Sequence, residues 1–296
     1  MSGFIQVVIN GLLIGGVYAL LAVGLTMIFG VMKIINFAQC EYLMLGMYLT
    51  YCFYTIFGMG AEDNPYIFII PVAVIMLIFG MAVYQICIRP IVGRDMVSYI
   101  LLTVGLSYIL QNAAQIFWTA NPKSIDTAIK SQSIYFEAID VAIPTAKLIS
   151  FILAVAFVLL VSVLLKKTDI GRAMRATSES PQVAALLGIN AKKSYLLAFG
   201  LGSLFAGVAG VLLSPIYTVY PRVGTLFSTT IFAVVILGGL GSVTGALVGG
   251  LLIGIVENMV GTYVALDLAP VGVFVLFILV MLLKPNGLFG EGGRKA

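Results

Sequence analysis

Residues 166–193 read KKTDIGRAMRATSESPQVAALLGINAKK, the only long polar stretch between strongly apolar segments of this chain. Six of its side chains are basic and two are acidic, in a protein whose charged residues are 9% of the total. Membrane proteins concentrate Lys and Arg in the loops on the cytoplasmic side of the bilayer. The stretch therefore predicts a cytoplasmic loop, 166–194, between two membrane-spanning helices.

This loop contains the signals of one short helix. Ser180 is a suitable N-cap, Pro181 a suitable first helical residue and Gly188 a suitable residue just beyond the end, which together predict a helix over 182–187. Its apolar face consists of Val183, Leu186 and Leu187. Such a short helix is not stable alone in water, so it has to pack against something. Either it packs on its own bundle, or it docks into a partner subunit.

The composition outside the loop indicates a polytopic membrane protein. Hydrophobic residues are 61% of the chain, there is no His and one Trp, and the mean hydropathy is +1.13. The three cysteines, Cys40, Cys52 and Cys87, all lie in apolar segments and have no metal-site or disulfide spacing. The net charge of +4 is explained by cytoplasmic loops, not by nucleic-acid binding.

The apolar segments number about eight or nine at roughly 20 residues per crossing. The predicted spans are 4–30, 34–57, 66–88, 96–118, 147–165, 195–213, a Gly-rich closing segment over 230–260, and 270–283. The connection over 120–146 is external by alternation, and its segment SIYFEAIDVAIP (133–144) predicts a small strand or hairpin. Its length suits a docking surface for an external partner as well as a plain connection. The whole chain, 1–296, is expected to form one all-α transmembrane domain.

Basic residues also predict the orientation of the chain. No Lys or Arg precedes the first span and Lys33 follows it, which favours an N-terminus outside the cell. The tail after Lys284 is Gly-rich and basic, which favours a cytoplasmic C-terminus.

Small residues recur every four positions in two of the later spans. Gly202, Ala206 and Gly210 form one series, and Gly241, Gly245 and Gly249 form another. This spacing lets two helix backbones approach closely, so both series predict helix packing.

Three polar residues stand close together at the start of the second predicted span: Asn36, Gln39 and Glu41. An ionised carboxylate in the middle of a bilayer costs roughly 2.5 to 3.5 kcal/mol on insertion scales. The favoured interpretation is that Glu41 meets lipid headgroups or lies near a helix N-terminus at the start of the span. The functional interpretation is a broken or re-entrant element that lines a translocation path.

A second polar set lies in the fourth predicted span. Gln111 and Gln115 are four residues apart and share a helix face, with Asn112 beside them. Such a stripe more often makes hydrogen bonds between helices than contacts a substrate. In both cases it should face protein or water and not lipid. Glu257 and Asn258, toward the outer end of the closing segment, are expected at the interface or paired within the bundle.

Several kinds of chemistry have no residues to support them. The chain contains no G-x-x-x-x-G-K-[ST] motif for nucleotide hydrolysis, no His for a triad or a metal site, and no array of charged residues across its spans. These features favour a conduit operated by partners over an enzyme, and they predict neither a metal nor a cofactor in this chain.

The loop and both ends of the chain carry a family resemblance. Gln182, Val183, Ala184 and Gly188 occupy the places of the Glu-Ala-Ala, three residues, Gly pattern of the coupling loop in ABC importer permeases. The segments GRAMRA (171–176), ALLGIN (185–190), AFGLGSLFAGVAGVL (198–212), 11–46 and 232–257 resemble the inner-membrane permeases of branched-chain amino-acid ABC transporters. Family members commonly carry a His-Gly pair where Gln39 and Cys40 stand here, so no role of that pair is carried over.

This resemblance, which covers nearly the whole chain, implies an assembly in a bacterial inner membrane. The implied partners are a second permease, two cytosolic subunits that bind ATP, and an external substrate-binding protein. It implies that Pro181, Ala184 and Gly188 belong to the coupling helix. We expect Arg172, Arg175 and Glu179 to make polar contacts with the ATPase, the alternative being that they only enforce the topology.

The resemblance also implies a substrate class. Leucine, isoleucine and valine are the implied substrates, while similar permeases carry urea, short amides or other amino acids, and more distant ones carry sugars. Two hypotheses from other classes remain: a stand-alone carrier driven by an ion gradient, and a structural scaffold that transports nothing.

Overall fold

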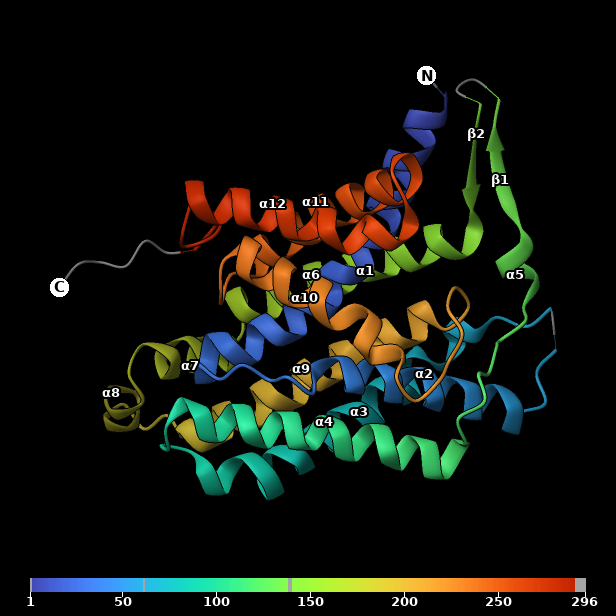
Figure 1. Cartoon of the computed structure of the whole chain (residues 1–296). Coiled ribbons are helices and arrows are strands. Elements are labelled where there is room, and N and C mark those ends of the chain that lie inside the picture. Colours follow the sequence, from blue (N-terminus) through green and yellow to red (C-terminus); the bar gives the residue numbers. More distant parts are fainter. Residues whose placement is uncertain (1, 61, 138–139, 291–296) are drawn as a thin grey trace.

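Helices build almost all of the protein. The computed structural model describes residues 2–60, 62–137 and 140–290. Its helices are α1 (Ser2–Met32), α2 (Gln39–Ile56), α3 (Ile69–Val83), α4 (Met96–Trp118), α5 (Ala128–Ser131), α6 (Thr145–Lys167), α7 (Asp169–Glu179), α8 (Pro181–Leu186), α9 (Ala191–Leu213), α10 (Val223–Gly238), α11 (Val243–Tyr263) and α12 (Ala269–Leu283) (Figure 1). Short 3-10 or π turns lie at Pro65–Phe68, Tyr84–Ile88, Arg89–Ile91 and Leu266–Leu268.

The first helix is the centre of the bundle. Its sequence is apolar on all sides, so every face of it can be buried. It packs against α6, α9, α10 and α11. Glycine makes the closest of these approaches possible: a Cβ at Gly15 would lie 2.7 Å from the carbonyl oxygen of Gly250 on α11. Backbones in such contact gain dispersion energy that larger side chains would prevent.

The two predicted series of small residues pack helices together. A Cβ at Gly202 would meet the Ile28 side chain of α1 at 2.7 Å, and one at Gly210 would meet the backbone nitrogen of Met47 on α2 at 2.8 Å. Gly245 and Gly249 lie against α10, and Gly241 belongs to the turn before α11. The packing prediction is therefore confirmed for the helical members of both series.

The two ends of the bundle differ in what they carry (Figure 1). At one end, which we call the hairpin end, β1 (Ser133–Phe136) and β2 (Val141–Pro144) pair antiparallel. The Gln6 side chain of α1 bonds both the amide and the carbonyl group of Ala142, at 2.8 and 2.6 Å, and so holds this hairpin on the bundle. At the opposite end, which we call the α7–α8 end, the segment 168–190 protrudes. The predicted hairpin is thus confirmed.

Most of the predicted spans match helices. Among the described residues, seven helices are long and apolar enough to cross a membrane, and α10 is a shorter apolar helix. The predicted spans 4–30, 96–118, 147–165, 195–213 and 270–283 fall within α1, α4, α6, α9 and α12, and 66–88 corresponds to α3 with its flanking turns. The protein is a multi-pass membrane protein with an all-α bundle.

Two predicted segments begin elsewhere. The helix expected from residue 34 starts only at Gln39, because Lys33 takes a left-handed φ of 57° and Asn36 forms a local turn, with its side-chain oxygen 3.1 Å from the Ala38 amide. The helix expected from residue 230 starts earlier, at Val223. Both of these helices, α2 and α10, begin at buried residues inside the bundle.

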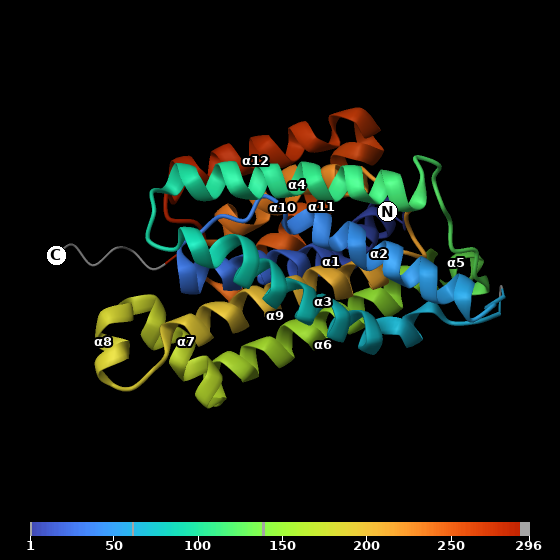
Figure 2. The same ribbon diagram turned by 90° about the horizontal axis from the view of Figure 1, so that it is seen from below.

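The helices lie on two sides of α1. Figures 1 and 2 show α4, α10 and α12 along one side, and α3, α6 and α9 along the other. The attachment of α4 to the bundle is slight, since its buried side chains are only Tyr99, Thr103, Leu106 and Ala114.

Candidate functional site

The break between α1 and α2 places polar groups at mid-depth in the bundle. Asn36 and Gln39 are fully buried. The Asn36 amide donates to the Gln39 side-chain oxygen at 3.3 Å, and the Gln39 amide donates to the Gly202 carbonyl at 2.9 Å. Gly202 lies midway along α9. The non-helical residues 33–38 therefore run into the interior instead of along one surface.

Glu41 lies in the first turn of α2 and is only 3% exposed. One of its carboxylate oxygens accepts from the Gln111 amide at 2.8 Å and from the Ser107 hydroxyl at 3.2 Å, both on α4. The other oxygen has no hydrogen-bond partner among the described residues and would lie 2.9 Å from a Cβ at Gly224, in the first turn of α10. The positive ends of two helices thus lie near this carboxylate and stabilise its charge. The prediction that Glu41 lies near a helix N-terminus is confirmed. The prediction that it meets lipid headgroups is wrong, because Glu41 is buried in the bundle.

The polar set on α4 divides between two surfaces. Gln111 is half-buried and holds Glu41, whereas Asn112 and Gln115 are exposed on the surface of this chain. The Asn112 amide donates to the Tyr108 carbonyl of its own helix at 2.7 Å. Gln111 and Gln115 were predicted to share a helix face, but they do not contact the same neighbour. Gln111 bonds Glu41 of α2, whereas Gln115 is exposed.

Several hydroxyl groups in this region were not predicted from the sequence. Ser107, one turn before Gln111, completes the Glu41 site. On α10, Thr225 and Thr229 are exposed and Ser228 is half-buried. Their three- and four-residue spacing puts them on one helix face, a signal that was available once the start of α10 was known.

Glu257 belongs to a second interior cluster. The rings of Tyr18 and Tyr217 pack on Phe227 of α10, with centroid distances of 6.1 and 5.2 Å, and the Tyr18 hydroxyl faces the Glu257 carboxylate. Asn258 donates to the Gly254 carbonyl of its own helix at 3.4 Å. Glu257 was predicted either at the membrane interface or paired within the bundle, and it lies within the bundle.

The short helix in the 166–194 loop is α8, one residue earlier than predicted. The Ser180 hydroxyl accepts from the Val183 amide at 3.3 Å, which caps the N-terminus. At the other end the amides of Gly188 and Ile189 donate to the carbonyls of Ala185 and Ala184 at 3.0 and 2.9 Å, and Gly188 has a φ of +79°. These are the bonds of a Schellman motif, so the predicted caps are confirmed.

The apolar side chains of α8 are not covered by the bundle. Ala184 is 1% exposed and anchors the helix, whereas Val183, Leu186 and Leu187 are 55%, 87% and 72% exposed. One of the two predicted alternatives was that this helix packs on its own bundle. It does so only through the inner face that bears Ala184. The outer face is an apolar knob at the α7–α8 end.

Arg172, Arg175 and Glu179 lie on α7, a helix that was not predicted from the sequence, whereas the lysines of the loop lie at the end of α6 and the start of α9. Arg172 pairs with Asp169, and Arg175 donates to the Leu165 carbonyl. Arg175 and Glu179 also line a hollow of about 760 Å³ at the α7–α8 end, together with Gly30, Lys33, Ser178, Ile236, Leu240, Gly241, Ser242, Pro285, Asn286, Phe289 and Gly290. Pro181 and Gly188 are exposed on α8 and at its end.

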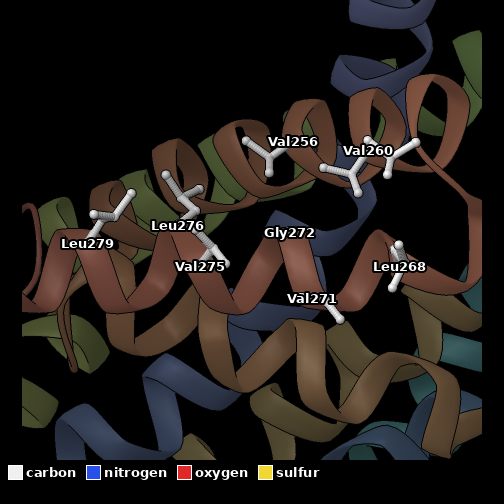
Figure 3. Close-up of a pocket in the computed structure, with 9 residues that line it drawn as sticks. Val256, Val260, Leu268, Val271, Gly272, Val275, Leu276 and Leu279 are labelled. Carbon is white, nitrogen blue, oxygen red and sulfur yellow. The ribbon is translucent and has the colours of Figure 1, made fainter.

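A groove between α11 and α12 contains no polar side chain (Figure 3). Its volume is about 380 Å³, and its lining is Val256, Val260, Val264, Leu268, Val271, Gly272, Val275, Leu276 and Leu279. It offers dispersion contacts but no side-chain hydrogen bond, which suits hydrocarbon better than a polar ligand. In the part of the chain that the structure describes, no three His, Cys, Asp or Glu side chains come together as a metal site.

Comparisons with known proteins agree with one another over nearly the whole chain. A family model described as "Branched-chain amino acid transport system / permease component" matches residues 7–283. The high-affinity branched-chain amino acid transport system permease protein LivH of Escherichia coli (strain K12) is 31% identical over an alignment of 295 positions, which covers 97% of this chain and 96% of that protein.

Two further relatives come from different organisms. The high-affinity branched-chain amino acid transport system permease protein BraD of Pseudomonas aeruginosa is 32% identical over 97% of this chain and 96% of its own length. The probable branched-chain amino acid transport permease protein LivH of Methanocaldococcus jannaschii is 30% identical over 98% of this chain and 94% of its own.

Proposed function

The chain belongs to the family of branched-chain amino acid transport system permease components, and from this we propose that it is the permease subunit of an ATP-driven importer for leucine, isoleucine and valine. The substrate class follows from the names of the relatives. The feature of this chain that carries the mechanism is α8, a capped helix that presents Val183, Leu186 and Leu187 at one end of a membrane bundle.

In this proposal α8 is the part of the permease that an ATPase moves. Its caps hold it rigid and its exposed apolar side chains fit a groove in another protein, because burying a leucine side chain is worth about 1.5–3 kcal/mol. Closure of two ATPase subunits around ATP would displace α8, and α7 and α9 would pass the movement to the bundle. ATP is bound by the partners, and this chain needs no cofactor of its own.

The orientation follows from the same assignment. The α7–α8 end, with its basic residues and the 760 Å³ hollow, faces the cytoplasm of a bacterium and carries the C-terminus. The hairpin end and the N-terminus face outward, where an external substrate-binding protein releases its ligand. In this arrangement Arg172, Arg175 and Glu179 make polar contacts with the ATPase.

The path for the substrate passes the break between α1 and α2. A non-helical segment at membrane depth is tolerated where it is buried in protein or lines a cavity, and transporters place such breaks at their binding sites. We assign Asn36, Gln39, Glu41 and Gln111 to the inner wall of the path, and Asn112 and Gln115 to its open side.

The test changes the end of α8 without touching its side chains. At Gly188 a Cβ has free space, so Gly188→Val acts only through the left-handed φ, whereas Gly188→Asn tolerates this conformation. We expect Gly188→Val to lose leucine uptake and co-purification of the ATPase subunits in mild detergent, and Gly188→Asn to keep both.

Two outcomes would refute parts of the proposal. Full uptake by a well-expressed Gly188→Val variant would show that coupling does not use α8. If the unmodified chain is purified from its host without ATPases or a second permease, under conditions that keep other membrane complexes intact, a stand-alone carrier becomes the better explanation.

A further inference from the structure

The outward faces of most helices are suited to lipid. The large exposed side chains are Ile70, Val74, Ile75 and Ile78 on α3, Ile152, Leu159, Leu160 and Val163 on α6, and Val271, Phe274, Val275, Ile278, Leu279 and Leu282 on α12. Hydrocarbon can cover all of these without loss of hydrogen bonds. Nothing on these faces requires a protein neighbour.

One face does not fit this pattern. α4 is long enough to span the membrane, and its exposed side chains Tyr108, Asn112 and Gln115 lie ten, six and three residues before its end at Trp118. On α10, Thr225 and Thr229 are exposed as well. Polar side chains inside membrane spans almost always face protein or a water-filled cavity, because lipid tails offer them no partner.

The two polar helices lie on either side of Glu41. Glu41 of α2 accepts hydrogen bonds from Ser107 and Gln111 of α4, and its second oxygen abuts Gly224 of α10. Both helices lie on the same side of the bundle, opposite α3, α6 and α9 (Figures 1 and 2). The exposed amides and hydroxyls therefore flank the buried carboxylate.

The spacing on α4 is that of a helix-packing seam. Tyr108, Asn112 and Gln115 follow one another at four and three residues, the alternation that keeps a stripe against one neighbouring helix. Continuing the stripe backward gives Gly105, where an added Cβ would meet no atom within 4 Å. A small residue with open space in front of it leaves room for the backbone of another helix.

We propose that this α4–α10 face, defined by Tyr108, Asn112, Gln115, Thr225 and Thr229, is where the second permease subunit packs, so that the path runs between the two subunits past Glu41. The inference rests on the proposed function for the existence of that subunit and adds the surface that meets it. The partner's helix here must carry amide or hydroxyl side chains. Asn112 and Gln115 then fix the register of the two helices.

Photo-crosslinking in native membranes tests the surface directly. A benzophenone amino acid replaces Asn112 in the tagged full-length chain, and the matched control carries it at Ile152 on α6, on the opposite side of the bundle. Asn112 is six residues from the end of α4 at Trp118, and Ile152 is seven from the start of α6 at Thr145, so both lie at similar depth near the hairpin end. Ile152 is 57% exposed. Adducts are identified by mass spectrometry.

We expect the probe at 112 to crosslink a second membrane protein of the same permease family and the probe at 152 to crosslink lipid. Adducts of position 112 with lipid alone, while the second permease co-purifies with the probe variant and the unmodified chain takes up leucine, would overturn the assigned surface and leave the proposed function intact. Absence of both uptake and a second permease with the unmodified chain would instead refute the proposed function.

A second measurement does not depend on the probe. Asn112→Leu and Gln115→Leu should each reduce the yield of co-purified second permease by about threefold, which corresponds to ~0.6 kcal/mol for one hydrogen bond between membrane helices. Ile152→Leu should leave the yield unchanged. Equal yields for all three variants would contradict the proposal.

Discussion

The Glu41 carboxylate lies where α2, α4 and α10 come together. It is in the first turn of α2, accepts hydrogen bonds from Ser107 and Gln111 of α4, and lies against the first turn of α10. Since few side chains of α4 are buried, the two hydrogen bonds form a substantial share of what fixes this helix.

We therefore expect Glu41→Leu and Gln111→Leu to be strongly coupled. Each single substitution removes the Glu41–Gln111 hydrogen bond and leaves the remaining side chain with Ser107 alone, which costs about 1–3 kcal/mol of unfolding free energy. The double variant should lose less than the sum by ~1 kcal/mol. The measurement is unfolding of the purified chain in detergent, with all four combinations compared.

A control pair shows whether the coupling is local. Thr50, further along α2, bonds only the Gly46 carbonyl of its own helix at 2.7 Å in the described structure. The losses caused by Glu41→Leu and Thr50→Val should add within about 0.5 kcal/mol. If the Glu41 and Gln111 losses add equally well, then the carboxylate does not hold α4.

The sequence contained part of this site. A carboxylate and two amides within six residues of an apolar run indicate something other than plain lipid contact, and Asn36, Gln39 and Glu41 are indeed buried. Ser107 could not be found in the same way, because its role depends on which helix stands opposite Glu41. Helical periodicity groups Gln111 with Gln115, but it does not say that a neighbour covers only the first.

The short helix α8 was predictable because its signals are local. Ser180, Pro181 and Gly188 form caps within a few residues, and no distant contact decides them. The break at 33–38 was one of two alternatives left open by the sequence, since Lys33 and Asn36 fit a broken element as well as the start of a span and no local signal chooses between them. What determines it is the turn at Asn36 and the bond from Gln39 to α9, and the second of these exists only in the folded bundle.

The exposed knob on α8 gives a prediction that separates docking from folding. Leu186 and Leu187 are largely exposed, so the double variant Leu186→Ser, Leu187→Ser should keep the thermal stability of the isolated chain. It should lose the ATPase subunits, because their contact with the knob loses about 1.5–3 kcal/mol for each buried leucine. Thermal unfolding in detergent and co-purification are the two measurements.

The matched control is Ile170→Ser on α7, at the same end of the bundle and 44% exposed. It removes one exposed aliphatic side chain outside α8 and should leave ATPase binding close to normal. An equal loss of the ATPase in both variants would mean that binding depends on the general apolarity of this end and not on α8.

The bundle as a whole combines a rigid half with a looser one. On one side α1, α9 and α11 are joined by glycine contacts that leave no space for a methyl group. On the other side α4 is attached through a few side chains and the Glu41 hydrogen bonds. Close-packed interfaces move as units, so a change at α8 reaches α9 directly, while α4 can follow a partner.

The ionisable side chains inside the bundle bear on the energy source for transport. Two carboxylates lie inside the bundle and face neutral groups. Buried Glu41 faces Ser107 and Gln111, and partly buried Glu257 faces Tyr18. An ion-coupled carrier draws its energy from charge that moves or binds within the membrane, about 2.3 kcal/mol per elementary charge for 100 mV. Two separate carboxylates with neutral partners do not form a relay for that charge.

We therefore expect leucine uptake by the chain reconstituted with its co-purified partners to require ATP on the side of the α7–α8 end. It should proceed without any ion gradient, and excess isoleucine or valine should inhibit it, whereas urea should not. The matched control is the Gly188→Val variant purified in the same way, which should lack the ATPase subunits and stay inactive with ATP while it still binds its substrate-binding protein. Uptake that needs an ion gradient and ignores ATP would contradict the coupling mechanism, because α8 would then have no ATPase to follow.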